Sequence, residues 1–239
     1  MTRRGQAQLD AMAEVVKVFA KVEQQIVFCG SCVLALYART TAPSALRLTK
    51  DVDCICTVTP FARLSALLAQ MCEAGVLAPD TRLMCRYSIR ASGTVVDVID
   101  PEGLTTGATD PWVERAAARA GRYAVADELE VSAVTPPYFL AMKLAALLDR
   151  GPDEMSADAE DIVTVALEVP GLERQIHEAG LAAEIQQQME RVLTRYAVAS
   201  WAELVDYHIA PEELASAPRV SAVLTSLAGE APEDPPAPR

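Results

Sequence analysis

The pattern of apolar and polar positions divides the chain into two parts. In the first part, stretches with helical spacing alternate with strand-like apolar runs, and in the second part the spacing is helical only. Between residues 6 and 24, apolar side chains recur three and four positions apart, which predicts an amphipathic packing helix. Short apolar runs bounded by turn residues predict strands. These runs lie at about residues 25–29, 52–58, 82–90, 94–100, 122–125 and 129–131.

Helical stretches separate these strands, at about residues 31–38, 60–74 and 112–120. Thr135-Pro136-Pro137 then interrupts the pattern, and the chain after it shows helical spacing. We therefore expect an α/β (α+β) region over residues 1–134 and a helical C-terminal domain over residues 135–229. Residues 230–239 are rich in proline and acid and cannot build a core, so we expect a disordered tail there.

The charge of the chain limits its partners. The formal net charge is −12 over 239 residues, so the whole surface does not attract nucleic acid, and an RNA contact would need a local basic patch. Arg3 and Arg4 precede an amphipathic stretch, and no uncharged apolar run is long enough to span a bilayer. We expect a cytoplasmic protein with no membrane partner.

Six cysteines invite either a disulfide or a metal interpretation. We expect small buried thiols of a cytosolic protein. A zinc site built from Cys29, Cys32, Cys54 and Cys56 is the alternative. It is disfavoured because a single residue separates Cys54 from Cys56, which does not suit a zinc ribbon.

The first candidate for chemistry is Gly30-Ser31, between a predicted strand and a predicted helix. Gly30 allows the backbone to approach a ligand closely, and Ser31 opens a helix whose free N–H groups favour phosphate. The alternative is a simple turn with an N-cap.

Three aspartates form the second candidate. Asp51 and Asp53 open the predicted strand 52–58 and point to the same side, about 6.5 Å apart along it. Converging carboxylates can hold Mg²⁺ when phosphates complete its coordination. Asp97 lies within an apolar strand, where a charge is costly unless it binds a metal or pairs with an arginine.

The third candidate lies after the proline interruption. Lys143 sits in an apolar helix, where it either extends to water or meets an anion. Asp158 and Asp161 follow a short loop, and the simplest interpretation of Asp158 is a helix N-cap.

These landmarks, over roughly residues 26–165, resemble the nucleotidyltransferase superfamily. Gly30-Ser31 followed by Asp51-Val52-Asp53 is similar to its G-S…D-x-D signature. The stretch from Thr49 to Asp53 looks most like the AbiEii-type branch, whose members are often toxins of toxin–antitoxin pairs. The run from Lys143 to Arg150, then Asp158-x-x-Asp161, resembles the C-terminal signature of that branch, although Ala157 stands where the family usually has lysine.

The resemblance implies a nucleotidyltransferase-like mixed β-sheet flanked by helices and followed by a helical domain that contributes to the active site. It also implies roles for named residues. The metal ligands for Mg²⁺ or Mn²⁺ would be Asp51, Asp53 and Asp97. The nucleotide would be bound by Gly30, Ser31, Lys143 and Asp158. The catalytic set would be Asp51, Asp53, Asp97, Lys143 and Asp161, with the choice between Asp158 and Asp161 left open.

The implied activity is metal-dependent transfer of a nucleoside monophosphate from an NTP to an acceptor hydroxyl, by a toxin acting on tRNA and paired with a cognate antitoxin. A local acceptor patch could come from six arginines, Arg82, Arg86, Arg90, Arg115, Arg119 and Arg122. Two alternatives remain open. One is transfer to a small cationic molecule such as an antibiotic, which suits the acidic chain, and the other is a non-catalytic nucleotide-binding module.

Overall fold

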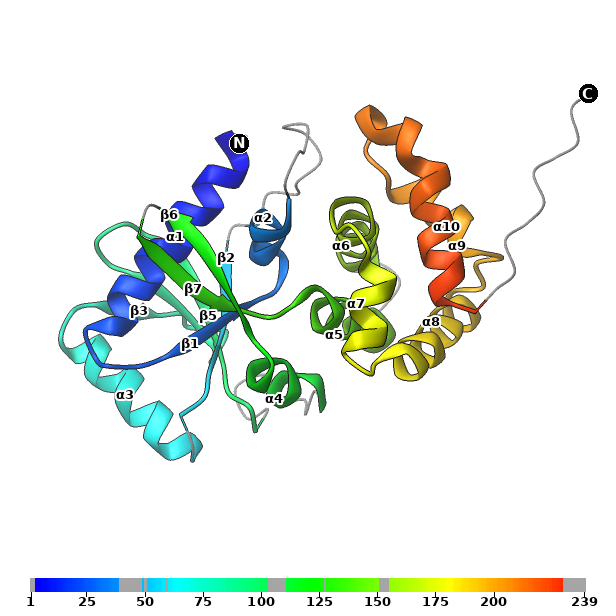
Figure 1. Cartoon of the computed structure of the whole chain (residues 1–239). Helices are drawn as coiled ribbons and strands as arrows, with labels where there is room; N and C mark the ends of the chain where they lie inside the picture. The colour runs from blue at the N-terminus through cyan, green and yellow to red at the C-terminus, as the bar shows by residue number, and fades with distance from the viewer. Residues whose placement is uncertain are drawn as a thin grey trace, which may run out of the picture. The chain divides into compact units, whose positions relative to one another are not determined.

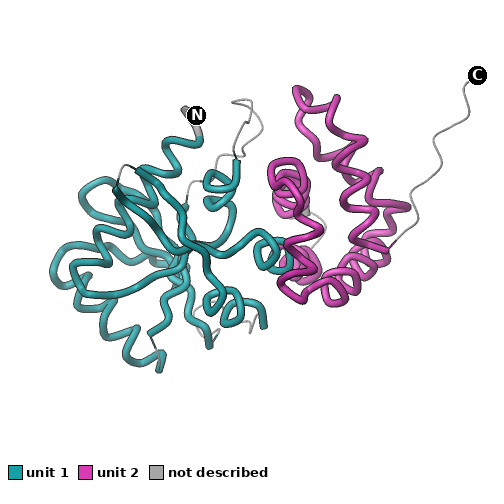
Figure 2. The backbone as a smooth tube through the Cα atoms, viewed as in Figure 1, with its two compact units in different colours: residues 1–142 teal, residues 143–239 magenta. Residues whose placement is uncertain are grey.

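The computed structural model describes residues 3–38, 49, 51–58, 60–102, 111–126, 128–150 and 155–229. The chain divides into two compact units, residues 1–142 and 143–239 (Figure 2). Every described strand lies in the first unit, and the described part of the second unit is helical (Figure 1). This confirms the fold class expected from the sequence, a mixed α/β region followed by helices. The division falls at 142/143, whereas the sequence-based boundary was placed at 134/135.

Seven strands form one mixed sheet in the order β3-β4-β5-β2-β1-β7-β6. Their bounds are β1 Ile26–Cys29, β2 Asp51–Cys56, β3 Leu77–Pro79, β4 Arg86–Ile89, β5 Val95–Ile99, β6 Gly121–Ala126 and β7 Leu129–Ala133. Only β2–β5 and β1–β7 are parallel pairs. The other four neighbours pair antiparallel. The short strand β3 was not expected, because its Leu-Ala-Pro sequence has no strand pattern.

The central strands are apolar because the sheet is buried there. Cys54, Ile55 and Cys56 of β2 and Val96 and Val98 of β5 are almost fully inaccessible to solvent. Helix α1 (Arg3–Ala20) packs against β6 and β7, and α3 (Phe61–Glu73) packs against β3 (Figure 1). Helix α4 (Pro111–Ala118) also belongs to the first unit.

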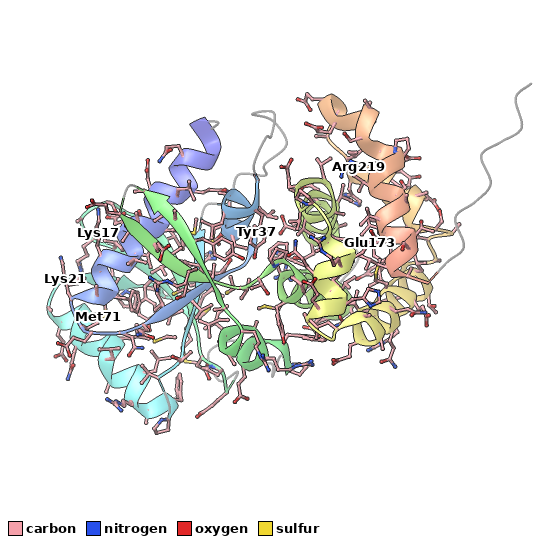
Figure 3. All side chains as sticks on the ribbon, in the orientation of Figure 1. Lys17, Lys21, Tyr37, Met71, Glu173 and Arg219 are labelled. Carbon is pink, nitrogen blue, oxygen red and sulfur yellow. The ribbon has the colours of Figure 1, made fainter. Side chains whose placement is uncertain are left out.

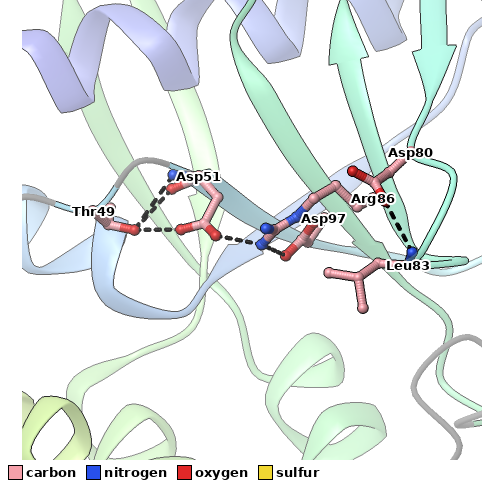
Figure 4. Close-up of polar contacts among 6 residues, drawn as sticks. All are labelled: Thr49, Asp51, Asp80, Leu83, Arg86 and Asp97. Atoms are coloured by element: carbon pink, nitrogen blue, oxygen red, sulfur yellow. Dashed lines mark hydrogen bonds and ion pairs between the residues drawn. The ribbon is translucent and has the colours of Figure 1, made fainter.

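Two predicted elements have different bounds in the structure. The helix expected at 31–38 is a short 3-10 turn, η1 (Ser31–Val33), followed by the single-turn helix α2 (Leu34–Tyr37). The strand expected from residue 82 begins only at Arg86. The cause is Asp80, whose Oδ1 accepts the backbone N–H groups of Arg82 (2.7 Å) and Leu83 (3.0 Å) and holds this stretch as a turn. Figure 4 shows the contact with Leu83.

Aromatic side chains anchor the end of α2. Tyr37 is buried and donates a hydrogen bond to the carbonyl of Val134, and its ring contacts those of Tyr123 and Phe139. Figure 3 labels Tyr37 of α2 and also Lys17 of α1, whose side chain is exposed. This packing fixes the segment that follows Gly30-Ser31.

The helices after the sheet are α5 (Pro136–Asp149), α6 (Met155–Glu168), α7 (Leu172–Glu178), α8 (Ala182–Tyr196), α9 (Trp201–His208), the 3-10 segment η3 (Pro211–Ser216) and α10 (Ala217–Leu227). In the second unit, α10 packs against α6, α8 and α9, and Trp201 of α9 is fully buried. Helix α6 begins at Met155, so the interpretation of Asp158 as an N-cap is wrong. Of the helices described, none has the length and apolar character that crossing a membrane requires.

Candidate functional site

Gly30 joins β1 to η1 in a conformation that a side chain would not tolerate. Its φ is 64°, in the left-handed region that favours glycine. A Cβ added there would lie 1.9 Å from Oδ2 of Asp53. The two sequence motifs are therefore in direct contact, with the Asp53 carboxylate lying over the bare backbone of Gly30. Ser31 follows and is buried.

The strand register aligns the polar positions of four adjacent strands. Cys29 of β1 pairs with Asp53 of β2, Asp53 pairs with Asp97 of β5, and Asp97 pairs with Arg86 of β4. Residues paired in register point to the same face of a sheet. Asp51 joins them, because it lies two positions from Asp53.

Arg86 connects two of the three aspartates (Figure 4). Its Nε donates to Oδ1 of Asp97 (2.8 Å), and its Nη2 donates to Oδ2 of Asp97 (2.7 Å) and to Oδ2 of Asp51 (2.5 Å). Thr49 holds the other Asp51 oxygen, Oδ1, at 2.5 Å. We call Arg86, Asp51 and Asp97 the Arg86 cluster. The hydrogen bonds to Asp97 raise the pKa of Arg86, although partial burial opposes them.

The donor set of this face suits a hard divalent cation. Three carboxylates lie on adjacent strands, and oxygen donors of this kind bind Mg²⁺ or Mn²⁺. The Asp53 carboxylate lies where a Cβ at position 30 would be, so only glycine there lets Asp53 keep its place in the row. The residues therefore fit the expected ion by type and face. Yet among the described residues no three His, Cys, Asp or Glu side chains are gathered for a metal, and Arg86 already joins Asp51 to Asp97.

The cysteines do not add a metal site. All six lie in the described part of the chain and are free thiols, four of them buried and two, Cys72 and Cys85, half-buried. Burial raises the pKa of the Cys54 thiol well above its usual range, with the neighbouring Cys56 adding to the effect. A protonated thiol is a poor metal ligand.

A second charged cluster lies within the second unit. Lys143 of α5 donates to Oδ1 of Asp158 (3.0 Å) and lies 2.6 Å from Oδ2 of Asp161, and Arg150 contacts Oδ2 of Asp158 at 2.7 Å. We call these four residues the Lys143 cluster. Both carboxylates are completely buried. Burial pulls the pKa of Lys143 down, but Asp161 and Asp158 outweigh it and leave that pKa raised.

The structure thus brings the predicted site residues together in two groups. Gly30, Ser31, Asp51, Asp53 and Asp97 belong to the first unit, and the Lys143 cluster belongs to the second. The expectation that both groups serve one active site stays a prediction. Lys143 does not extend to water, as one interpretation had it, because two buried aspartates hold it.

Arg86 and Thr49 are the residues whose roles the sequence did not reveal. The sequence places Arg86 only among six arginines of a possible acceptor patch, and it allows an arginine partner for Asp97 without identifying which arginine. A two-residue turn at Ser92-Gly93 would set residue 88 opposite Asp97. The hairpin instead closes with the pair Ile89 and Thr94, which sets Arg86 there.

A pocket of about 170 Å³ opens beside Asp51, between α1 and the first residues of β2 and β5. Its polar lining comes from Gln8, Thr49, Asp51 and Thr94. A space of this size next to a carboxylate can accept part of a small ligand.

No family model and no curated protein matches this sequence. Among solved structures, the chain is similar to an antigenic nucleotidyltransferase-like protein from Paracoccidioides brasiliensis. The identity is 18%, the TM-score is 0.49, and the match covers 80% of this chain and 91% of the other. A likeness this weak assigns neither a residue nor an activity.

Proposed function

We propose that the protein is a metal-dependent nucleotidyltransferase, which transfers a nucleoside monophosphate from an NTP to an acceptor hydroxyl. The observation that carries the proposal is the row of Asp51, Asp53 and Asp97 on one face of β2 and β5, with Asp53 seated over the Gly30 turn. The same residues Gly30, Ser31, Asp51 and Asp53 carry the resemblance to the G-S…D-x-D signature.

In the proposed reaction, the acceptor oxygen forms a bond to the α-phosphorus, the bond from that phosphorus to the bridging oxygen breaks, and pyrophosphate leaves. A bound Mg²⁺ or Mn²⁺ would neutralise the triphosphate charge. Asp51 and Asp53 would hold the ion. Asp97, on the neighbouring strand, would either share the ion or accept the proton of the attacking hydroxyl.

The Gly30 turn supplies close approach rather than a helix dipole. The helical segments after it, Ser31–Val33 and Leu34–Tyr37, are too short to build a large dipole. The absent Cβ of Gly30 lets the Asp53 carboxylate lie against the backbone, beside the place where the phosphates would bind. Roles for Lys143, Asp158 and Asp161 at the phosphates rest on the sequence resemblance alone.

We propose tRNA as the acceptor and a toxin–antitoxin pair as the setting, following the AbiEii-type resemblance. Exposed arginines of the first unit offer the local positive charge that an acidic chain needs for RNA. Some of them already have partners, because Arg115 lies 4.4 Å from the Trp112 ring centre, Arg122 pairs with Glu130, and Arg90 donates to the carbonyl of Leu77. The net charge of −12 supports a second candidate, transfer to a small cationic acceptor.

Labelled NTPs test the proposal. The purified chain is incubated with Mg²⁺ or Mn²⁺, each α-labelled NTP in turn, and either total RNA or a cationic aminoglycoside. Label in RNA of tRNA size supports the first acceptor, and label only in the aminoglycoside supports the second. NTP binding without transfer to RNA, protein or small molecule would leave a non-catalytic binding module.

Asp53→Asn is the variant that tests the site, because it keeps the shape of the side chain and removes one charge. We expect transfer to fall by at least about a hundredfold, as for loss of a group that stabilises transition-state charge. Asp10→Asn removes the same charge from an exposed position on α1 and should leave transfer unchanged. Equal activity in the two variants would reject the assignment of Asp53.

A further inference from the structure

The oxygens of two aspartates converge on one atom of Arg86. Oδ2 of Asp51 and Oδ2 of Asp97 lie 2.5 Å and 2.7 Å from the same Nη2 (Figure 4). A divalent ion bound to both oxygens at about 2.1 Å would take the position of that nitrogen. The guanidinium and the ion therefore cannot occupy these two oxygens together.

The contact is a built feature rather than a chance meeting of long side chains. The pairing of β4 with β5 sets Arg86 directly opposite Asp97. The fork geometry is bidentate towards Asp97, and Thr49 orients the second Asp51 oxygen away from the arginine.

The exposure of the Arg86 cluster allows the contact to be exchanged. The side chains of Arg86, Asp51 and Asp97 are 30%, 27% and 12% exposed. The guanidinium can therefore leave the carboxylates without being buried elsewhere, and water or a ligand can replace it. A guanidinium released in this way is also a good partner for phosphate oxygens, which its fork fits as well as it fits carboxylates.

We propose that Arg86 is an internal counter-ion that competes with the divalent cation for Asp51 and Asp97 and couples cation binding to triphosphate binding. The ion takes the two carboxylates, and the displaced guanidinium takes the phosphates. Each ligand then strengthens the binding of the other, since coupling between two sites is reciprocal. This regulation deepens the proposed function, and it rests on that proposal only for the identity of the two ligands.

Binding of Mn²⁺ alone, followed by electron paramagnetic resonance of the free ion, tests the competition without any turnover. Removing a positive charge a few ångströms from the ion should strengthen Mn²⁺ binding by at least about tenfold in Arg86→Gln. The matched control is Arg90→Gln, at the end of the same hairpin. This change removes the same charge, but Nε of Arg90 donates to the backbone carbonyl of Leu77 and not to a carboxylate of the proposed ion site. It should bind Mn²⁺ like the wild type.

Two further variants test whether the gain in Mn²⁺ affinity arises at Asp51 and whether it depends on the charge of residue 86. Asp51→Asn added to Arg86→Gln should abolish most of the gain in Mn²⁺ affinity. Arg86→Lys keeps the charge but loses the fork, so its affinity for Mn²⁺ should lie between those of the wild type and Arg86→Gln. If Arg86→Gln fails to fold by circular dichroism, the lysine variant alone decides, and an affinity equal to that of the wild type or weaker would overturn the inference.

The coupling is tested by repeating the Mn²⁺ titration with an equimolar mixture of the four NTPs. The gain in Mn²⁺ affinity that the NTPs cause should be several-fold larger in the wild type than in Arg86→Gln, after subtracting Mn²⁺ bound by free NTP. Equal gains in the two proteins would refute the coupling. Mn²⁺ competition without label transfer to any acceptor would reject the proposed transferase and keep the role of Arg86. Label transfer by the wild type, together with an Mn²⁺ affinity of Arg86→Gln equal to that of the wild type, would keep the proposed transferase and reject the role of Arg86.

Discussion

The Arg86 cluster and the Lys143 cluster are built from the same parts and differ in their access to water. In each, one cation joins two aspartates at 2.5–3.0 Å. The aspartates beside Lys143 are 0% exposed, whereas Asp51 and Asp97 are 27% and 12% exposed. The same pair chemistry is thus set in two different environments.

Access to water decides what such a pair can do. A charge that has lost its hydration depends on its partner, so a buried pair behaves as a fixed tie within the fold. In a half-exposed pair, each charged group gains little stability from the other and can bind an ion or a phosphate in its place. The comparison therefore favours a structural role for the Lys143 cluster, and it supports the exchangeable role proposed above for the Arg86 cluster. Arg150, whose side chain is 47% exposed, gives the Lys143 cluster a second cation and balances its charge.

The largest expected difference is in stability. Lys143→Met leaves two buried aspartates without their shared amine, and should lower the free energy of unfolding by about 3–5 kcal/mol. Arg86→Met should cost only about 1 kcal/mol, because water can reach its partners. Urea unfolding followed by circular dichroism measures both. Similar losses in the two variants would break the distinction between a fixed and an exchangeable pair.

Gly30→Ala should have the next largest effect, and it tests how tightly the exchangeable region is built. The new Cβ would collide with the Asp53 carboxylate, which adds a packing cost of about 1–3 kcal/mol to the backbone cost of about 1–2 kcal/mol. Gly75→Ala is the control, because Gly75 also has a positive φ of 70° but nothing within 4 Å of the new Cβ.

Urea unfolding and label transfer should separate these two glycine variants. Gly75→Ala should lose only the backbone part of the stability and keep transfer, while Gly30→Ala should lose transfer as well. Equal behaviour would mean that the contact between Gly30 and Asp53 has no functional weight.

The sequence was a good guide to the parts of the site that depend on local order. Asp51 and Asp53 alternate along one strand, so their common face followed from the two-residue period. Gly30 stands between an apolar strand and a helical turn, where the chain needs a positive φ that glycine adopts readily. The mixed α/β class followed in the same way, from periodicities that each lie within a short window.

Long-range pairing was beyond that reasoning. The partner of Asp97 depends on how the hairpin between β4 and β5 closes, and a small change of loop length replaces Arg86 with Ser88. The burial of Asp158 and Asp161 was also missed, because two acids in the first turns of a helix usually face water. Burial of this kind depends on how elements distant in the sequence pack together, which no local pattern reports.

A smaller effect is expected in alkaline solution, where the buried pair should show its titration. Burial lowers the pKa of Lys143, but Asp161 and Asp158 raise it more, so the folded state holds this proton more tightly than the unfolded state. The stabilisation is therefore complete below the ordinary pKa of lysine, about 10.4, and is lost as pH rises through the raised value.

Urea unfolding between about pH 9 and pH 12 measures this loss. The free energy of unfolding should fall more steeply for the wild type than for Lys143→Met. Parallel curves would mean that the amine is not bound more tightly in the folded state.

The smallest effect is expected for Arg122 and Glu130, which extend the comparison to a pair of mostly exposed side chains. Their side chains are 64% and 57% exposed and lie 3.5 Å apart on neighbouring strands. At this exposure the coupling energy should be at most about 0.5 kcal/mol. A double-mutant cycle of Arg122→Ala and Glu130→Ala, measured by urea unfolding, gives that energy without the effects of each single change. A coupling energy between Arg122 and Glu130 larger than the loss of unfolding free energy in Arg86→Met would show that side-chain exposure does not determine the strength of these pairs. The argument that the Arg86 contact is exchangeable would then lose its physical basis.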